Sequence, residues 1–145
     1  MKEATGSTFM IYVLIIFLAV YITFVAVALN YAKAFRVKNS VIDIIEQNEG
    51  IDEFNDKYTK GDVINLIEAR LKDYSYNVNL SSETIDKYSD YVCYDLGYCI
   101  SKESNNIGKE YYGVVTFVEL SIPFMNFSVT IPIRGETRVI ERINS

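Results

Sequence analysis

The sequence predicts an α+β fold in which a long N-terminal helix, transmembrane at first and amphipathic later, packs on a small antiparallel β-sheet domain. Three observations predict this class. An uncharged apolar run fills residues 9–29, helical spacing of apolar residues continues to residue 48, and runs of β-branched and aromatic residues fill the last third. We expect residues 7–31 to form the transmembrane helix and residues 32–145 to form one soluble α+β domain.

The apolar run from Phe9 to Leu29 contains no charge, no glycine and no proline. As a helix it spans about 30 Å, the thickness of the hydrocarbon core of a bilayer. A cleaved secretory signal is the competing interpretation, because Ala26-Val27-Ala28 matches a small-residue cleavage site. The run is longer than the usual apolar region of a signal peptide, so an uncleaved anchor is favoured.

The helix is expected to continue beyond the membrane. No glycine or proline occurs between residues 30 and 48, and Val37, Val41, Ile44 and Ile45 recur at helical spacing on one side. Gly50 supplies the left-handed conformation that commonly ends a helix. One helix of roughly 40 residues is therefore predicted.

The rest of the domain is predicted as one short helix followed by β-structure. Asp62 is expected to cap a helix that runs from Val63 to Tyr74. Its apolar face consists of Val63, Ile64, Ile67 and Leu71. The strands are expected at residues 74–80, 111–122, 127–133 and 137–141.

A hairpin with a specific register is predicted for residues 117–131, with its turn at residues 123–126. The opposed pairs are Ile122 and Phe127, Leu120 and Val129, and Val118 and Ile131. Because side chains alternate, these six share one face, which we expect to close the core around Val37, Val41 and Ile44. The opposite face carries Glu119, Ser121, Ser128 and Thr130 and should be wet. Pro132 indicates an edge strand or a bulge.

Cys93 and Cys99 are the only cysteines. Asp95-Leu96-Gly97 fits a three-residue hairpin loop, which would place the two cysteines directly opposite each other. At that spacing a disulfide can form, and a reduced buried pair is the alternative. A disulfide would indicate an oxidising compartment and a domain outside the cytoplasm. The basic residues Lys33, Arg36 and Lys38, which follow the apolar run, favour the opposite orientation.

Composition excludes several function classes. The chain has no histidine, which rules out Ser-His and Cys-His catalytic pairs, and its net charge of −5 disfavours nucleic acid as a partner. The acidic run Asp43, Glu46, Glu49, Asp52, Glu53 and Asp56 lacks the spacing of a calcium loop and fits a solvated face better. We therefore expect no metal, no cofactor and no enzymatic activity.

A short polar leader, an apolar helix that becomes amphipathic and an antiparallel sheet together resemble the type IV pilin-like superfamily. Within it the chain is most similar to the minor pilins of tight-adherence (TadE-like) pili, with a sequence match over about the first 35 residues. The resemblance implies that residues 1–6 are a leader, cut between Gly6 and Ser7, and that the N-terminus faces the cytoplasm. Ile11 and Tyr12 then occupy the positions where that family carries a glutamate and an aromatic residue. Because the glutamate is missing, a minor, tip or initiating role fits better than a major filament subunit.

Two functions follow as hypotheses. The first is a structural, minor pilin-like subunit of a bacterial surface pilus or secretion apparatus, with its domain outside the cell membrane. Its partners would be the lipid bilayer and other pilin-like subunits or membrane proteins. They would contact the apolar helix around Tyr12, Ala19 and Ala26. The alternative is a single-pass accessory or binding domain of an envelope complex that does not polymerise.

Overall fold

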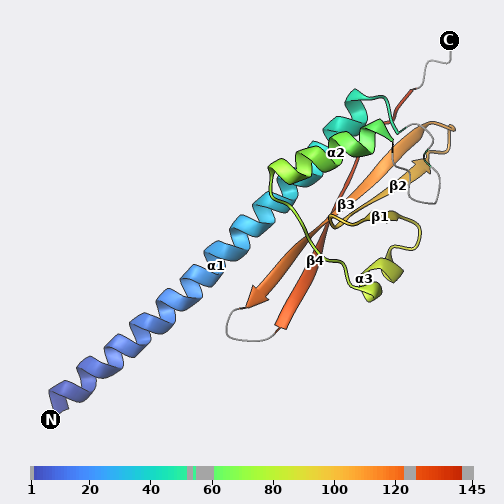
Figure 1. The fold of residues 1–145 in the computed structure, drawn as a ribbon. Helices are drawn as coiled ribbons and strands as arrows, with labels where there is room; N and C mark the ends of the chain where they lie inside the picture. Colours follow the sequence, from blue (N-terminus) through green and yellow to red (C-terminus); the bar gives the residue numbers. More distant parts are fainter. Residues whose placement is uncertain (1, 52–53, 55–60, 123–126, 142–145) are drawn as a thin grey trace.

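The computed structural model describes residues 2–51, 54, 61–122 and 127–141, and it has the predicted α+β architecture (Figure 1). Its elements are α1 (Lys2–Gln47), α2 (Asp62–Asp73), α3 (Ser82–Lys87), β1 (Val92–Tyr94), β2 (Tyr98–Ser104), β3 (Glu110–Ile122) and β4 (Phe127–Glu136). The second half of α1 packs on the sheet and on α2, whereas its first half projects from the domain without covering.

The long helix α1 has 46 residues. It ends as predicted, because Gly50 has φ of +105° and its backbone N–H donates to the carbonyl of Ile45 at 2.9 Å. The helix is somewhat longer than expected because it begins at Lys2, well before the apolar run.

The four strands form one antiparallel sheet in the order β1-β2-β3-β4. The register predicted for the long hairpin is confirmed, since Val118 pairs with Ile131, Leu120 with Val129, and Ile122 with Phe127. Pro132 lies in β4, which is an edge strand of the sheet. Residues 123–126, where the turn was predicted, lie outside the described part of the chain.

Two predicted strands are wrong. Residues 74–80 do alternate in burial, with Tyr76 and Val78 buried, but the segment joins no ladder; the Val78 N–H donates instead to the Leu96 carbonyl at 3.2 Å. The segment from 137 to 141 contributes only one isolated bridge, between Glu110 and Ile140. The alternating apolar residues therefore indicate only that one side of an extended segment is buried. Such burial does not require hydrogen-bonded pairing with a neighbouring strand.

The short helices differ from expectation at their starts. In α2 all four apolar residues are buried as predicted, but Gly61 occupies the N-cap position and Asp62 is the first helical residue. Helix α3 was not predicted; its N-cap is Ser81, whose side chain accepts a hydrogen bond from the Thr84 N–H. With only six residues, α3 is too short to show helical periodicity in the sequence.

The core lies between the second half of α1 and one face of the sheet. A stripe on α1 is fully buried: Ala34, Val37, Val41 and Ile45. The Thr116 hydroxyl donates to the Ala34 carbonyl at 3.0 Å, which fixes the level of β3 along the helix. On the other face of the sheet, Phe117 is buried in an edge-to-face contact with Tyr88.

Candidate functional site

Most of the first half of α1 presents an apolar surface that the described part of its own domain does not cover. Among its large side chains, Phe9, Met10 and Phe17 are each at least 68% exposed. The described residues contain one helix that is long and apolar enough to cross a membrane, and it is α1. The hydroxyl groups of Thr8 and Thr23 are paired within the helix, since each donates to the carbonyl four residues earlier. This surface is the main candidate for contact with lipid or with other helices.

The three positions singled out for helix assembly lie along one side of α1, because they are spaced by seven residues. Tyr12 is exposed and Ala19 is half-buried. Ala26 is exposed but also lines a cleft that faces Leu120 and Val129 of the same chain. A bulky residue at position 26 would therefore meet its own domain before it met a partner.

Gly6 and Ser7 lie on exposed turns near the start of α1. A Cβ atom added at Gly6 would meet nothing within 4 Å. The glycine is therefore not required by packing in this structure, and cleavage after it stays a prediction.

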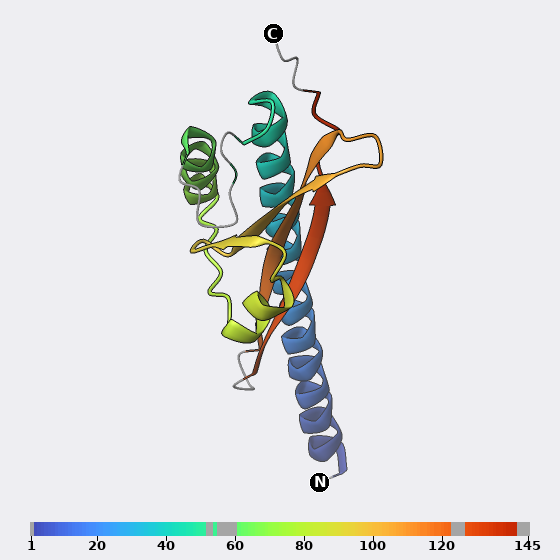
Figure 2. The same cartoon turned by 90° about the vertical axis from the view of Figure 1, so that its right-hand side faces the viewer.

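The base of the β3–β4 hairpin closes the core as expected, since Val118 is buried in one cluster with Val37 and Val41. The end of the hairpin lies instead beside the apolar half of α1, which corrects the expectation that all six apolar residues pack around Val37, Val41 and Ile44. A cleft of about 220 Å³ separates hairpin and helix; its lining residues are Ile22, Thr23, Ala26, Val27, Asn30, Leu120, Ser121 and Val129. Both views show the hairpin running along α1 toward the N-terminal half (Figure 1, Figure 2). The side chains of Phe127, Val129 and Ile131 are 58%, 37% and 39% exposed. Three of the four residues predicted on the wet face, Glu119, Ser121 and Ser128, are exposed, whereas Thr130 is half-buried.

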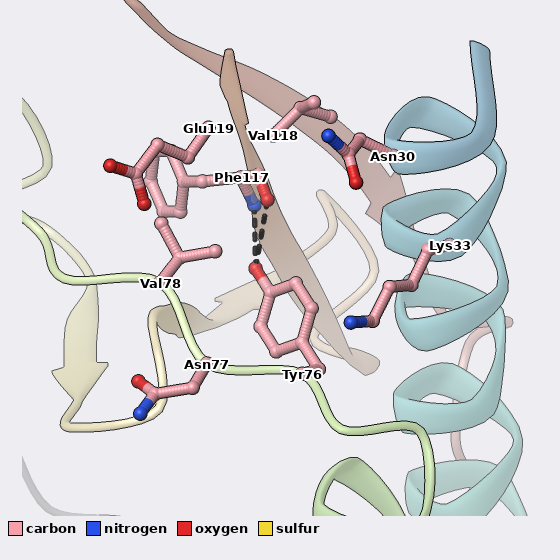
Figure 3. A pocket seen from close by; sticks show the side chains of 8 residues that line it. All are labelled: Asn30, Lys33, Tyr76, Asn77, Val78, Phe117, Val118 and Glu119. Atoms are coloured by element: carbon pink, nitrogen blue, oxygen red, sulfur yellow. Dashed lines mark hydrogen bonds between the residues drawn. The ribbon is translucent and has the colours of Figure 1, made fainter. Parts of the chain in front are cut away.

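A second, more polar pocket of about 170 Å³ lies where the hairpin leaves the core (Figure 3). The Lys33 ammonium group on its helix side donates to the Ser75 carbonyl at 2.6 Å. The Tyr76 hydroxyl donates to the Gly97 carbonyl at 2.7 Å and accepts from the Phe117 N–H at 2.9 Å. Burial raises the pKa of Tyr76 to about 12, so the hydroxyl is a stable donor. Tyr76 thus bonds the backbone of β3 next to the residue that pairs with Tyr98, the first residue of β2.

Cys93 and Cys99 form a disulfide, with their Cα atoms 4.0 Å apart. They are directly opposed across β1 and β2, as the loop prediction required. Gly97 has φ of +85°, and a Cβ atom there would lie 2.2 Å from the Val78 carbonyl oxygen. Only glycine therefore suits this loop position.

Glu46, one member of the acidic run, forms an ion pair with Arg138. The Glu46 carboxylate accepts from the backbone N–H of Arg138 at 2.8 Å and lies 3.1 Å from its guanidinium group. The backbone hydrogen bond from Arg138, and then the guanidinium, hold the pKa of Glu46 below its ordinary value. Asp52, Glu53 and Asp56 lie outside the described residues. Within the described part of the chain, no three acidic, cysteine or histidine side chains gather into a metal site.

Sequence reasoning missed the hairpin cleft, the Tyr76 contact and the Glu46–Arg138 pair, which all join segments that are distant in sequence. No protein-family model matches the chain, and no match is found among curated proteins or solved structures.

Proposed function

We propose that this protein is a single-pass envelope protein of the pilin-like type, acting as a minor subunit of a surface pilus or secretion apparatus. The observation that supports it most is the division of α1. Its second half carries a fully buried stripe at Ala34, Val37, Val41 and Ile45, whereas its first half exposes apolar side chains along its whole length. The buried second half attaches α1 to the domain. The exposed first half can contact lipid or neighbouring helices.

The disulfide supports a domain that faces an oxidising compartment. Cys93 and Cys99 close a loop with a sequence separation of 6, and such bonds persist mainly outside the cytoplasm. For the orientation of the domain, we give the disulfide more weight than the basic residues Lys33, Arg36 and Lys38, because the Lys33 ammonium group donates to the Ser75 carbonyl of the domain. We therefore propose that the C-terminal domain lies outside the cell membrane.

The second candidate function is a membrane-anchored accessory domain that never polymerises. Ile11 favours it, because the pilin-like family carries a glutamate at this place, where it compensates the charged N-terminus of a neighbouring subunit. Without that carboxylate, a charged N-terminus in an apolar filament core would be costly. A minor or initiating role reconciles the two observations, because such a subunit need not repeat along a filament.

The N-terminus of the mature protein separates the two functions. Intact mass and N-terminal sequencing should be measured on protein sheared from cells and on protein left in the membranes. The pilin-like function predicts that both fractions begin at Ser7. An intact N-terminus ahead of Gly6 in every fraction, with nothing in the sheared material, would support the accessory domain instead.

A further inference from the structure

A stripe of exposed apolar residues repeats along α1 in alternating steps of four and three residues. Its members, which we call the heptad seam, are Met10, Leu14, Phe17, Tyr21, Phe24, Ala28, Tyr31 and Phe35. All eight are exposed, and the seven large ones are between 44% and 75% exposed. A repeat of about 3.5 residues keeps one side of a helix against a partner helix, as in a coiled coil. The seam is therefore suited to a second helix that runs along α1.

The seam lies on the side of α1 that the described part of its own domain leaves open. Residues two apart differ by about 200° around a helix, so Ala28 points nearly opposite to Ala26, which lines the cleft against the hairpin. Phe35 likewise points nearly opposite to Val37, which is fully buried in the core. Figure 1 shows the sheet and the hairpin along one side of α1. A partner helix can therefore reach the seam without displacing the core.

The domain covers the same repeat immediately after Phe35. The next two positions, Lys38 and Ile42, are half-buried. Both lie against β4, since a Cβ atom added at Gly135 would lie 2.8 Å from Lys38 Cδ and 2.9 Å from Ile42 Cδ1. The repeat thus continues to Ile42, with its last positions covered by the domain and its first eight left exposed by the described part of the chain.

Lipid alone does not account for the seam, because the seam extends past the apolar run. Tyr31 and Phe35 are 52% and 44% exposed. Phe35 lies six residues after Leu29, roughly 9 Å beyond the end of the apolar run along the helix axis. The neighbouring Asn30 and Arg36 are polar and exposed, so this stretch suits a contact with protein better than one with acyl chains.

A second copy of the chain is the partner that fits the seam best. Copies anchored by the same apolar run point in the same direction, so two α1 helices lie parallel and their seams meet at the same height. The seam holds five aromatic side chains, which together offer roughly 600 Å² per copy at their present exposure. Met10 and Leu14 bring this area toward the roughly 800 Å² per partner of a stable interface.

We propose that the heptad seam is a parallel homodimer contact, in which the α1 helices of two copies pair from Met10 to Phe35. Because the repeat is slightly shorter than that of a straight helix, the paired helices supercoil with a left-handed twist. The inference rests on the helix contacts of the proposed function and adds their side and their partner. It places the partner nearly opposite to Ala19 and Ala26, the positions that the sequence singled out for helix assembly.

Two alanines on opposite sides of α1 provide a matched test. A28C puts a thiol in the seam and A26C puts one in the cleft, and both positions are exposed. The natural cysteines are joined to each other, so each variant carries one free thiol. Each full-length variant should be oxidised in its membranes with copper phenanthroline, and non-reducing electrophoresis with mass measurement then detects a disulfide between copies.

A second substitution on the A28C protein tests the seam outside the apolar run. F35E would place like charges face to face in a parallel dimer. I107E is its control, because Ile107 is 80% exposed in the turn between β2 and β3, far from the seam.

We expect A28C to give a product of twice the chain mass and A26C to stay monomeric. F35E should abolish the A28C product, and I107E should leave it unchanged. Equal cross-linking of A28C and A26C would overturn the proposal, because it would show collisions without a preferred side. An A28C product of another mass would also overturn it and would assign the seam to a different protein. No product from A28C would overturn it as well; if the sheared protein still begins at Ser7, the proposed function stands without the dimer.

Discussion

The buried Tyr76 hydroxyl joins the backbone at Gly97 to the backbone at Phe117, just beyond the residues where β2 pairs with β3. It bonds the backbone of both Phe117 and Gly97, so Y76F should leave buried backbone groups unpaired and cost about 1–3 kcal/mol. The Tyr98 hydroxyl is the matched control, because it is buried and has no hydrogen-bond partner within the described residues. Urea unfolding of the full-length protein in detergent measures both variants. Y98F should be neutral or stabilising, and equal losses would refute this role of Tyr76.

Two glycines with positive φ provide a second comparison at the scale of single residues. G97A combines an unfavourable φ with a Cβ atom 2.2 Å from the Val78 carbonyl oxygen, whereas a Cβ atom at Gly108, with φ of +78°, meets nothing within 4 Å. G108A should therefore lose only about 1–2 kcal/mol for the backbone conformation. G97A should lose clearly more, and it should slow formation of the adjacent disulfide on oxidative refolding. Indistinguishable unfolding midpoints would contradict the close packing at Gly97.

At the scale of elements, the Glu46–Arg138 pair joins α1 to the segment after β4. Because the pKa of Glu46 is lowered in the folded state, its stabilisation is complete above the ordinary value of 4.5 and is lost as the pH falls through the folded value. E46Q should therefore be less stable than wild type at neutral pH, and the difference should shrink as the pH falls below 4.5. E49Q removes one charge two residues after the end of α1 and is the control. A difference that stays constant down to the acid end would contradict the ion pair.

The sequence predicted those elements whose constraints are local. The hairpin register followed from alternating side chains around a turn, and the disulfide followed from a three-residue loop ending in Gly97. The extended segment around Tyr76 was wrongly predicted as a strand. It is joined to β3 through the Tyr76 hydroxyl, which accepts from the Phe117 N–H, and not through a ladder of backbone hydrogen bonds. Local sequence patterns determine on which face of an element a residue lies. They do not determine which distant segment packs against that face.

The position of the hairpin relative to α1 could have been predicted from lengths. β3 has 13 residues and extends roughly 43 Å, whereas residues 30–47 of α1 cover only about 27 Å. An antiparallel hairpin of that length must pass the amphipathic half and reach the apolar one. The apolar residues at its end were therefore assigned wrongly to the core around Val41, although they do face the helix.

At the scale of the whole molecule, the disulfide tests the side of the membrane on which the domain lies. Thiol labelling of protein taken from cells, denatured without reduction, should modify neither Cys93 nor Cys99. Labelling after reduction should modify both and provides the control. Full labelling before reduction would place the domain in a reducing compartment and would restore the orientation that Lys33, Arg36 and Lys38 favour.

The central claim is that the apolar half of α1 recognises neighbouring helices as well as entering lipid. Lipid accepts any apolar sequence of this length, whereas helix packing depends on which residues share a side. The sharpest measurement scrambles residues 9–21 and 24–25 at constant composition. It keeps Ile22, Thr23 and Ala26, which line the cleft. Cross-linking in intact cell envelopes then compares the scrambled protein with the wild type. We predict that the scrambled protein inserts and forms its disulfide but loses its cross-linked partners; an unchanged cross-linking pattern would contradict the claim and leave α1 as an anchor alone.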